Sequence, residues 1–305
     1  MNNSQRRKYG KLVERINRRA ETYWLPKVEA ALKLKVRAVI ARLRNGGQSA
    51  ATRYLMEDIG NPALTAQIKK LYLQVGLDHA KRVNIGLQGE KKGIRAWFEL
   101  KRSGALGLNM EWTQYILAYL EKYLTSKLTF MMAGSTRDAL LKAINEGFSQ
   151  GKGVDDIIAL LKEWPYLRYQ AARIIRTEIN RAANVGTQAA GSTFEYEQQK
   201  EWIAAKDSRT RGNPINGVKD HANHWSLDGM VVEELGYFTD PRNGDKLQFP
   251  GDPAGSAASV INCRCTAALT AKRDENGRLI PKRRVSRVTV IMPSQNQNNR
   301  RVVTI

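Results

Sequence analysis

Apolar residues recur at helical spacing through the first part of the chain. Between residues 5 and 44 their spacing predicts one long amphipathic helix with a buried face. The positions concerned are Leu12, Ile16, Trp24, Leu25, Val28, Ala31, Leu32, Val36 and Ile40. Pro26 predicts a joint in this helix, and the stretch Asn45, Gly46 and Gly47 predicts its end. Similar patterns predict helices at residues 50–58, 62–83 and 110–132, with loops at 86–92 and 104–108.

The pattern changes in the second half of the chain. Ser135 and Asp138 predict a capped helix start, and helical spacing predicts helices at residues 135–148, 154–163 and 168–199. After Trp202 the apolar runs become short and are separated by turn residues, which predicts strands at residues 230–232, 237–239, 246–249 and 264–270. Helices followed by strands indicate an α+β fold rather than an alternating one.

These patterns divide the chain into three parts. Residues 1–134 are predicted to form a mainly helical N-terminal domain with a basic arm, and residues 135–270 a domain of helices and a small antiparallel sheet. Residues 271–305 form a basic tail with one predicted strand at 285–292. The polar stretch 295–301 is expected to be flexible unless a partner orders it.

The balance of charge is strongly basic. Lys and Arg number 50 against 29 Asp and Glu, which gives a net charge of +21. Such a charge attracts polyanions, so double-stranded DNA is a predicted partner, although a basic surface also serves solubility or fits an acidic protein. The residues expected to contact nucleic acid lie at the front of the first helix: Arg6, Arg7, Lys8, Lys11, Arg15, Arg18 and Arg19.

The sequence gives no indication of membrane insertion or secretion. Its apolar stretches are shorter than the eighteen or so residues of a membrane-spanning helix, and no apolar core of signal-peptide type precedes Trp24. The cysteine content, Cys263 and Cys265 alone, excludes a disulfide scaffold and favours a reducing compartment. Two residues apart on a strand, these cysteines would lie about 6.6 Å from each other, so two free thiols are expected.

Charged residues at alternate positions follow Trp202. If this piece is extended, Asp207, Arg209 and Arg211 face one way, and the carboxylate pairs with one of the two guanidiniums. This arrangement suits either a clamp that fixes the loop or a site that grips a ligand. The clamp is the preferred interpretation.

A second group has the chemistry of a zinc site. Imidazoles and thiolates from His221, His224, Cys263 and Cys265 would suit a closed tetrahedral centre, although the spacings His-x-x-His and Cys-x-Cys fall outside the usual finger patterns. The alternative, which needs no cofactor, is preferred. In it His224 hydrogen-bonds backbone near Asp228, and the thiols are small buried packing groups.

The remaining polar motifs are interpreted structurally. Asp228 with Gly229, and the stretch 250–253, have the composition of turns in which Asp caps its own loop and Gly supplies a positive φ. In a helix, Arg176, Thr177 and Glu178 cannot share one face. Glu178 and Arg181 are therefore expected to form a surface pair of small energetic value.

The order of these residues resembles the minor head proteins of tailed phages that are similar to the F protein of phage Mu. The resemblance covers residues 135–269 and rests on an ordered set: Arg176, Glu178, Trp202, Asp207, Arg209, Arg211, His224, Asp228, Gly229, Asn262, Cys263 and Cys265. It implies a structural, non-enzymatic minor capsid protein that aids head assembly and DNA packaging or delivery. The resemblance does not extend to the region before Ser135.

Partners and location follow from the same resemblance. It implies association with the portal protein, and with the scaffold or major capsid protein as further partners. The expected location is the head interior or portal vertex of the virion, with the host cytoplasm during assembly. The rival hypothesis is a metal-dependent nuclease or toxin-like transferase that uses Asp207, Arg209, His224 and Asp228, with His224 as general base.

Overall fold

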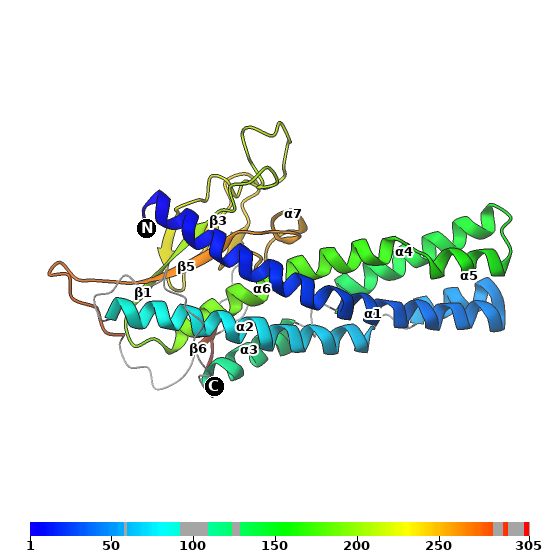
Figure 1. Cartoon of the computed structure of the whole chain (residues 1–305), viewed down its shortest axis with the longest axis horizontal. Helices are drawn as coiled ribbons and strands as arrows, with labels where there is room; N and C mark the ends of the chain where they lie inside the picture. The colour runs from blue at the N-terminus through cyan, green and yellow to red at the C-terminus, as the bar shows by residue number, and fades with distance from the viewer. Residues whose placement is uncertain (58–59, 92–108, 124–128, 283–288, 292–301, 305) are drawn as a thin grey trace. The chain divides into compact units, whose positions relative to one another are not determined.

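The protein is described from a computed structural model, which covers residues 1–57, 60–91, 109–123, 129–282, 289–291 and 302–304 (Figure 1). Its helices are α1 (Asn3–Glu57), α2 (Pro62–Lys91), α3 (Met110–Tyr123), α4 (Thr129–Ser149), α5 (Val154–Lys162), α6 (Tyr166–Thr193) and α7 (Ala257–Val260). Its strands are β1 (Gln198–Ile203), β2 (Val231–Glu233), β3 (Phe238–Thr239), β4 (Lys246–Leu247), β5 (Thr266–Ala271), β6 (Thr289–Ile291) and β7 (Val302–Thr304). Long helices followed by small antiparallel sheets confirm the α+β prediction.

The chain folds into two compact units, each assembled from separated segments. Unit 1 contains Met1–Ala20, Leu71–Leu120 and Arg176–Ile305, and unit 2 contains Glu21–Lys70 and Glu121–Ile175. The boundaries predicted at residues 134 and 270 stay predictions. None of the described helices is both long and apolar enough to span a membrane.

Unit 2 is built from helices that bury apolar faces. Along α1 the buried side chains follow helical spacing, at Trp24, Val28, Leu32, Val39 and Leu43. The side-chain oxygen of Asn61 accepts a hydrogen bond of 3.0 Å from the Leu64 amide and so caps the start of α2. Helix α5 buries Ile157, Ile158 and Leu161. The amphipathic pattern predicted for this part of the chain is confirmed.

The centre of unit 1 is a three-stranded antiparallel sheet in the order β2-β1-β5. The whole of β1 pairs with β5, from Gln198 opposite Ala271 to Ile203 opposite Thr266. On its other side β1 pairs with β2, where Glu201 lies opposite Val231. Trp202 is fully buried in β1 and points into the apolar cluster described below.

Several predicted boundaries are wrong. The predicted loop at 86–92 continues as helix to Lys91, and the predicted helix start at Ser135 lies inside α4. The predicted helix 168–199 ends at Thr193, and its last residues instead begin β1. The predicted end of the first helix is confirmed as a break, because Gly46 and Gly47 have non-helical backbone angles. The predicted loop 104–108 and the stretch 295–301 lie outside the described residues.

The basic arm, which is the first part of α1 and carries the cations from Arg6 to Arg19, is packed into unit 1. Tyr9 and Val13 form one buried cluster with Ile203 of β1 and Ala268 of β5. Arg6 donates a hydrogen bond of 2.9 Å to the carboxylate of Glu201. The arm therefore covers one face of the sheet and contributes side chains to its core.

Helices α2 and α6 approach each other at two glycines of unit 1. A Cβ placed on Gly186 would lie 2.1 Å from the carbonyl oxygen of Gly76, and this contact is with backbone rather than with a movable side chain. The close approach therefore needs glycine at position 186.

We expect Gly186→Ala to destabilise the protein by about 1 to 3 kcal/mol, because the two helices must move apart. The measurement is the free energy of unfolding by denaturant titration. Gly134→Ala in α4 is the matched control, since an added Cβ there meets nothing within 4 Å. That control should be neutral or stabilising by up to about 1 kcal/mol, the usual helix preference for Ala over Gly. Equal effects of the two substitutions would contradict the predicted close contact.

Candidate functional site

The candidate site lies behind the long loop that joins β1 to β2, residues 204–230. The loop folds over an apolar cluster of unit 1 formed by Trp202, Ala204, Leu227, Phe238, Leu247, Cys263 and Cys265. The rings of Trp202 and Phe238 meet edge to face, with centroids 5.2 Å apart. The imidazole of His224, which the loop supplies, is buried against this cluster, and its ring centroid lies 5.1 Å from that of Trp202.

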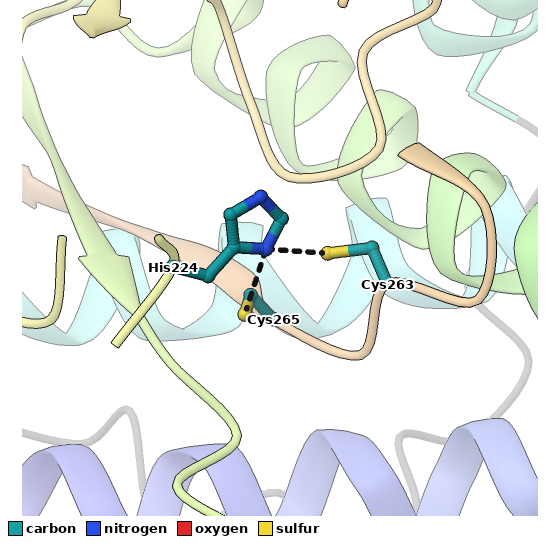
Figure 2. A group of neighbouring side chains, drawn as sticks. All are labelled: His224, Cys263 and Cys265. Atoms are coloured by element: carbon teal, nitrogen blue, oxygen red, sulfur yellow. Dashed lines mark hydrogen bonds between the residues drawn. The ribbon is translucent and has the colours of Figure 1, made fainter. Parts of the chain in front are cut away.

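Three metal-ligating side chains converge in this cluster. His224 Nδ1 lies 3.6 Å from the Sγ of Cys263 and 3.8 Å from the Sγ of Cys265 (Figure 2). All ligand atoms of the three residues lie within 4.8 Å of one another, and each residue is at most 2% exposed. Both cysteines are free and buried, as expected. His221, the fourth predicted member, is exposed and does not join the group.

Local backbone geometry explains why both thiols face inward. Asn262 adopts a left-handed conformation with φ of 57°, which Asn tolerates better than most residues. Its backbone N–H donates a hydrogen bond to Thr177 Oγ1 at 3.0 Å. The chain then runs toward β5 with side chains on alternate sides. Cys263 and Cys265 face His224, whereas Arg264 between them reaches the other side and contacts Asp207.

The far side of the imidazole faces a buried carboxylate. His224 Nε2 lies 4.0 Å from Asp240 Oδ2, and the two side chains are 1% and 0% exposed. Nε2 has no hydrogen-bond partner, while Asp240 is fixed by the amides of Asn223 and Arg242, at 2.8 Å each. The expected hydrogen bond of His224 to backbone near Asp228 is not formed.

The pKa values of the two thiols shift in opposite directions. The hydrogen bond from Cys265 holds the pKa of Cys263 well below its ordinary value, and the nearby His224 lowers it further against burial. The same bond, together with burial, raises the pKa of Cys265. Cys263 is therefore the first of the pair to become a thiolate.

The carboxylate clamp exists, but its partner differs from the predicted one. Asp207 forms a bidentate pair with Arg264, in which Nε donates to Oδ2 at 3.0 Å and Nη2 donates to Oδ1 at 2.5 Å. The segment is a turn rather than an extended strand, because Asp207 also accepts from the amide of Arg209 and the hydroxyl of Thr210, at 3.0 Å each. Arg209 is exposed, and Arg211 donates to the carbonyl of Ile261.

The pair of Glu178 and Arg181 is buried, so the prediction of a surface pair is wrong. Their side chains are 0% and 3% exposed, and Tyr72 donates 2.7 Å to the second carboxylate oxygen. Arg181 Nε donates at 2.7 Å to the carbonyl of Gly251, so α6 holds the loop after β4. Arg176 lies on the same helix and is half-buried.

The turn interpretation is confirmed for Gly251 and Asp252, whereas for Asp228 and Gly229 only the positive φ of the glycine is as predicted. Asp228 accepts from the amide of Ala204 at 3.0 Å and thereby closes the loop 204–230 on itself. Gly229 has a φ of 84°. Asp252 accepts from the amides of Gln248 and Ala254, at 2.8 and 2.9 Å. Both carboxylates therefore fix the backbone of their loops by accepting hydrogen bonds from main-chain amides.

A basic cavity of about 640 Å³ lies between the arm and the loop. Arg7 and Lys11 of α1 line one wall, and Lys206, Trp225 and Arg264 line the other. The Nζ of Lys206 lies 4.0 Å from the centroid of the Trp225 ring, a cation–π contact. Cations from two distant parts of the sequence thus face one hollow.

Sequence reasoning missed two residues of the site, Arg264 and Asp240. The alternation of Cys263, Arg264 and Cys265 could have indicated that the arginine faces away from the thiols. Asp240 carried no such signal, because Asp before Pro241 has the composition of an ordinary turn.

Comparison with known protein families finds a match in the part of the chain that carries the site. Residues 138–268 match the sequence family described as phage Mu protein F like protein. The resemblance to the Mu F-like family is confirmed. The Mu F-like region, residues 138–268, contains α5, α6, β1, the thiols and His224.

One curated relative is an uncharacterized protein of Bacillus subtilis (strain 168), YqbB. It is 26% identical over 141 residues, which are 46% of this chain and 44% of the relative's own length. No solved structure matches this chain.

We expect Asp207→Ala to destabilise the protein by about 1 to 2 kcal/mol, below the upper range for hydrogen bonds to charged groups, because 35% of the Asp207 side chain is exposed. Chemical denaturation of both proteins provides the measurement. The exposed neighbour supplies a control, since Arg209→Ala should change stability by less than about 0.5 kcal/mol. An Asp207→Ala protein as stable as the wild type would contradict the clamp.

The effect of Asp207 should depend on pH. Burial alone would raise the pKa of this carboxyl, but hydrogen bonds and charge from Arg264 outweigh burial and lower it. A lowered folded-state pKa means that its contribution is fully present above the unfolded value of about 3.9 and is lost as pH falls through the folded value. The stability difference between wild type and Asp207→Asn should therefore shrink toward zero in acid. A constant difference from neutral pH downward would contradict the assignment.

Proposed function

We propose that this protein is a structural minor capsid protein of a tailed bacteriophage, which aids head assembly and DNA packaging or delivery. The match of residues 138–268 to the Mu F-like family carries the proposal. In this proposal the protein associates with the portal vertex and the interior of the procapsid. Its protein partners are the portal protein and, in addition, the scaffold or major capsid protein.

The arrangement of the polar residues favours a structural role over the rival enzymatic one. Asp207 is held by Arg264, Asp228 by the backbone of Ala204, and His224 is 1% exposed behind the loop. A general base must reach its substrate within hydrogen-bond distance. The residues that the rival mechanism would use do not converge on an open cleft in the described part of the chain.

The exposed charge favours direct contact with DNA. Arg7, Lys11, Arg15 and Arg19 are all exposed and recur every four residues, so they form one stripe about 18 Å long on α1. The stripe leads past the cavity lined by Lys206 and Arg264. Of the other predicted contacts, Arg6 is paired with Glu201, Arg18 with Glu14, and Lys8 is exposed.

We expect the protein to be present in purified heads of the phage or prophage that encodes it, at few copies per particle. Quantitative mass spectrometry of particles and procapsids measures the copy number against the major capsid protein. Particles that lack the gene product should be reduced in number or in packaged DNA. Absence of the protein from both particles and procapsids would overturn the proposal.

We also expect binding to double-stranded DNA without sequence preference. If four to six phosphates are neutralised, a plot of the logarithm of the binding constant against the logarithm of the salt concentration should have a slope of about −3.6 to −5.4. Replacing Arg7, Lys11, Arg15 and Arg19 together by Gln should reduce the slope by about 3.6 in magnitude. The buried arm residues Tyr9 and Val13 are retained, because deletion of the arm would expose the core of unit 1.

The matched control removes four exposed cations elsewhere: Arg53, Lys69, Lys70 and Lys162, each to Gln. Both variants have a net charge of +17, that is +21 minus 4. Fluorescence anisotropy with a labelled duplex at several salt concentrations compares them. Equal losses in both variants would show that overall charge, rather than the stripe, attracts DNA, and no binding by the wild type at low salt would remove DNA as a direct partner.

A further inference from the structure

We propose that His224, Cys263 and Cys265 bind a Zn²⁺ ion through Nδ1 and two thiolates. The inference does not depend on the proposed role in heads, because it rests on the side chains alone. Imidazole and thiolate ligands favour zinc over hard cations such as Mg²⁺ and Ca²⁺, and no carboxylate is part of the set.

The distances suit one shared ion. With zinc bonds of about 2.3 Å to sulfur and about 2.0 to 2.1 Å to nitrogen, tetrahedral angles place the nitrogen and a sulfur about 3.6 Å apart. The two sulfur distances from His224 Nδ1 are 3.6 and 3.8 Å. Figure 2 shows both sulfurs turned toward the same ring nitrogen. The two N···S distances therefore fit one shared ion, and all three ligand atoms lie within 4.8 Å of one another.

The opposite ring nitrogen supports the same assignment. When Nδ1 binds a metal, Nε2 carries the proton and needs an acceptor, which in metal sites is commonly a carboxylate. Asp240 Oδ2 supplies an acceptor 4.0 Å from Nε2, and Nε2 has no hydrogen-bond partner. A movement of about 1 Å would close this to a hydrogen bond. We assign Asp240 as a positioning residue for His224.

Burial argues against a reactive role for the same three groups. The thiols and the imidazole are each 1 or 2% exposed, so a substrate carbonyl or phosphate has no approach. A structural ion instead needs burial, and it would fasten the loop 204–230 to the segment before β5. Three protein ligands leave the fourth tetrahedral position to a water molecule, an arrangement typical of catalytic zinc sites, but burial here keeps substrates away from that position.

The test is metal content of the full chain purified from cells grown with added zinc. We expect close to one zinc per chain in the wild type, and loss of bound zinc in His224→Ala, Cys263→Ser and Cys265→Ser. His221→Ala is the matched control, because this exposed residue of the same type lies three positions away and should leave the zinc content unchanged. Asp240→Asn should weaken zinc affinity by about 10- to 100-fold.

A second measurement covers variants that fail to fold. Titration of the wild type with a thiol-specific mercurial should release zinc in step with modification of both thiols, and Co²⁺ in place of zinc should give a thiolate charge-transfer absorption. Wild type that holds neither zinc nor Co²⁺ would overturn the proposal. Loss of zinc in His221→Ala, or its retention in both Cys variants, would equally overturn the assigned ligand set.

Discussion

The antiparallel pairing of β1 with β5 is the constraint on which unit 1 depends. It spans six residue pairs and brings β1, the strand that follows α6, beside the chain that carries the thiols. The arm of α1 packs on this pair through Tyr9, and the fully buried Trp202 projects from it into the apolar cluster. If this pairing were lost, the arm, the loop and the cysteines would lose their common support.

Much of this fold could be predicted from periodicity, because long helices repeat the same signal over many residues. The break at Gly46 and Gly47 and the buried stripe of α1 are examples. The central strand β1 could not be predicted in the same way. Its sequence continues the polarity of the helix before it, and Lys200 is buried there only because its Nζ donates to the carbonyls of Gly236 and Gln248, at 2.9 Å each.

The site shows the same division between local and long-range information. Turn chemistry at Asp252 is local, because its carboxylate accepts from the amides of Gln248 and Ala254, and the sequence was sufficient to predict it. The partner of Asp207 and the depth of Glu178 depend on residues far away in the chain, Arg264 and Tyr72. The spacing of residues along the sequence does not predict contacts between such distant positions. Charge spacing therefore identified a clamp correctly and assigned its partner incorrectly.

The alternation of side chains before β5 has a consequence for folding. A slip of one residue in the β1–β5 register would turn Arg264 into the apolar cluster and turn both cysteines outward. Burying an unpaired guanidinium costs several kcal/mol, and Asp207 would lose its partner at the same time. The alternation of Cys263, Arg264 and Cys265 thus makes this sheet intolerant of misaligned pairing. The loop 204–230 can pack correctly only when β1 and β5 pair in the correct register.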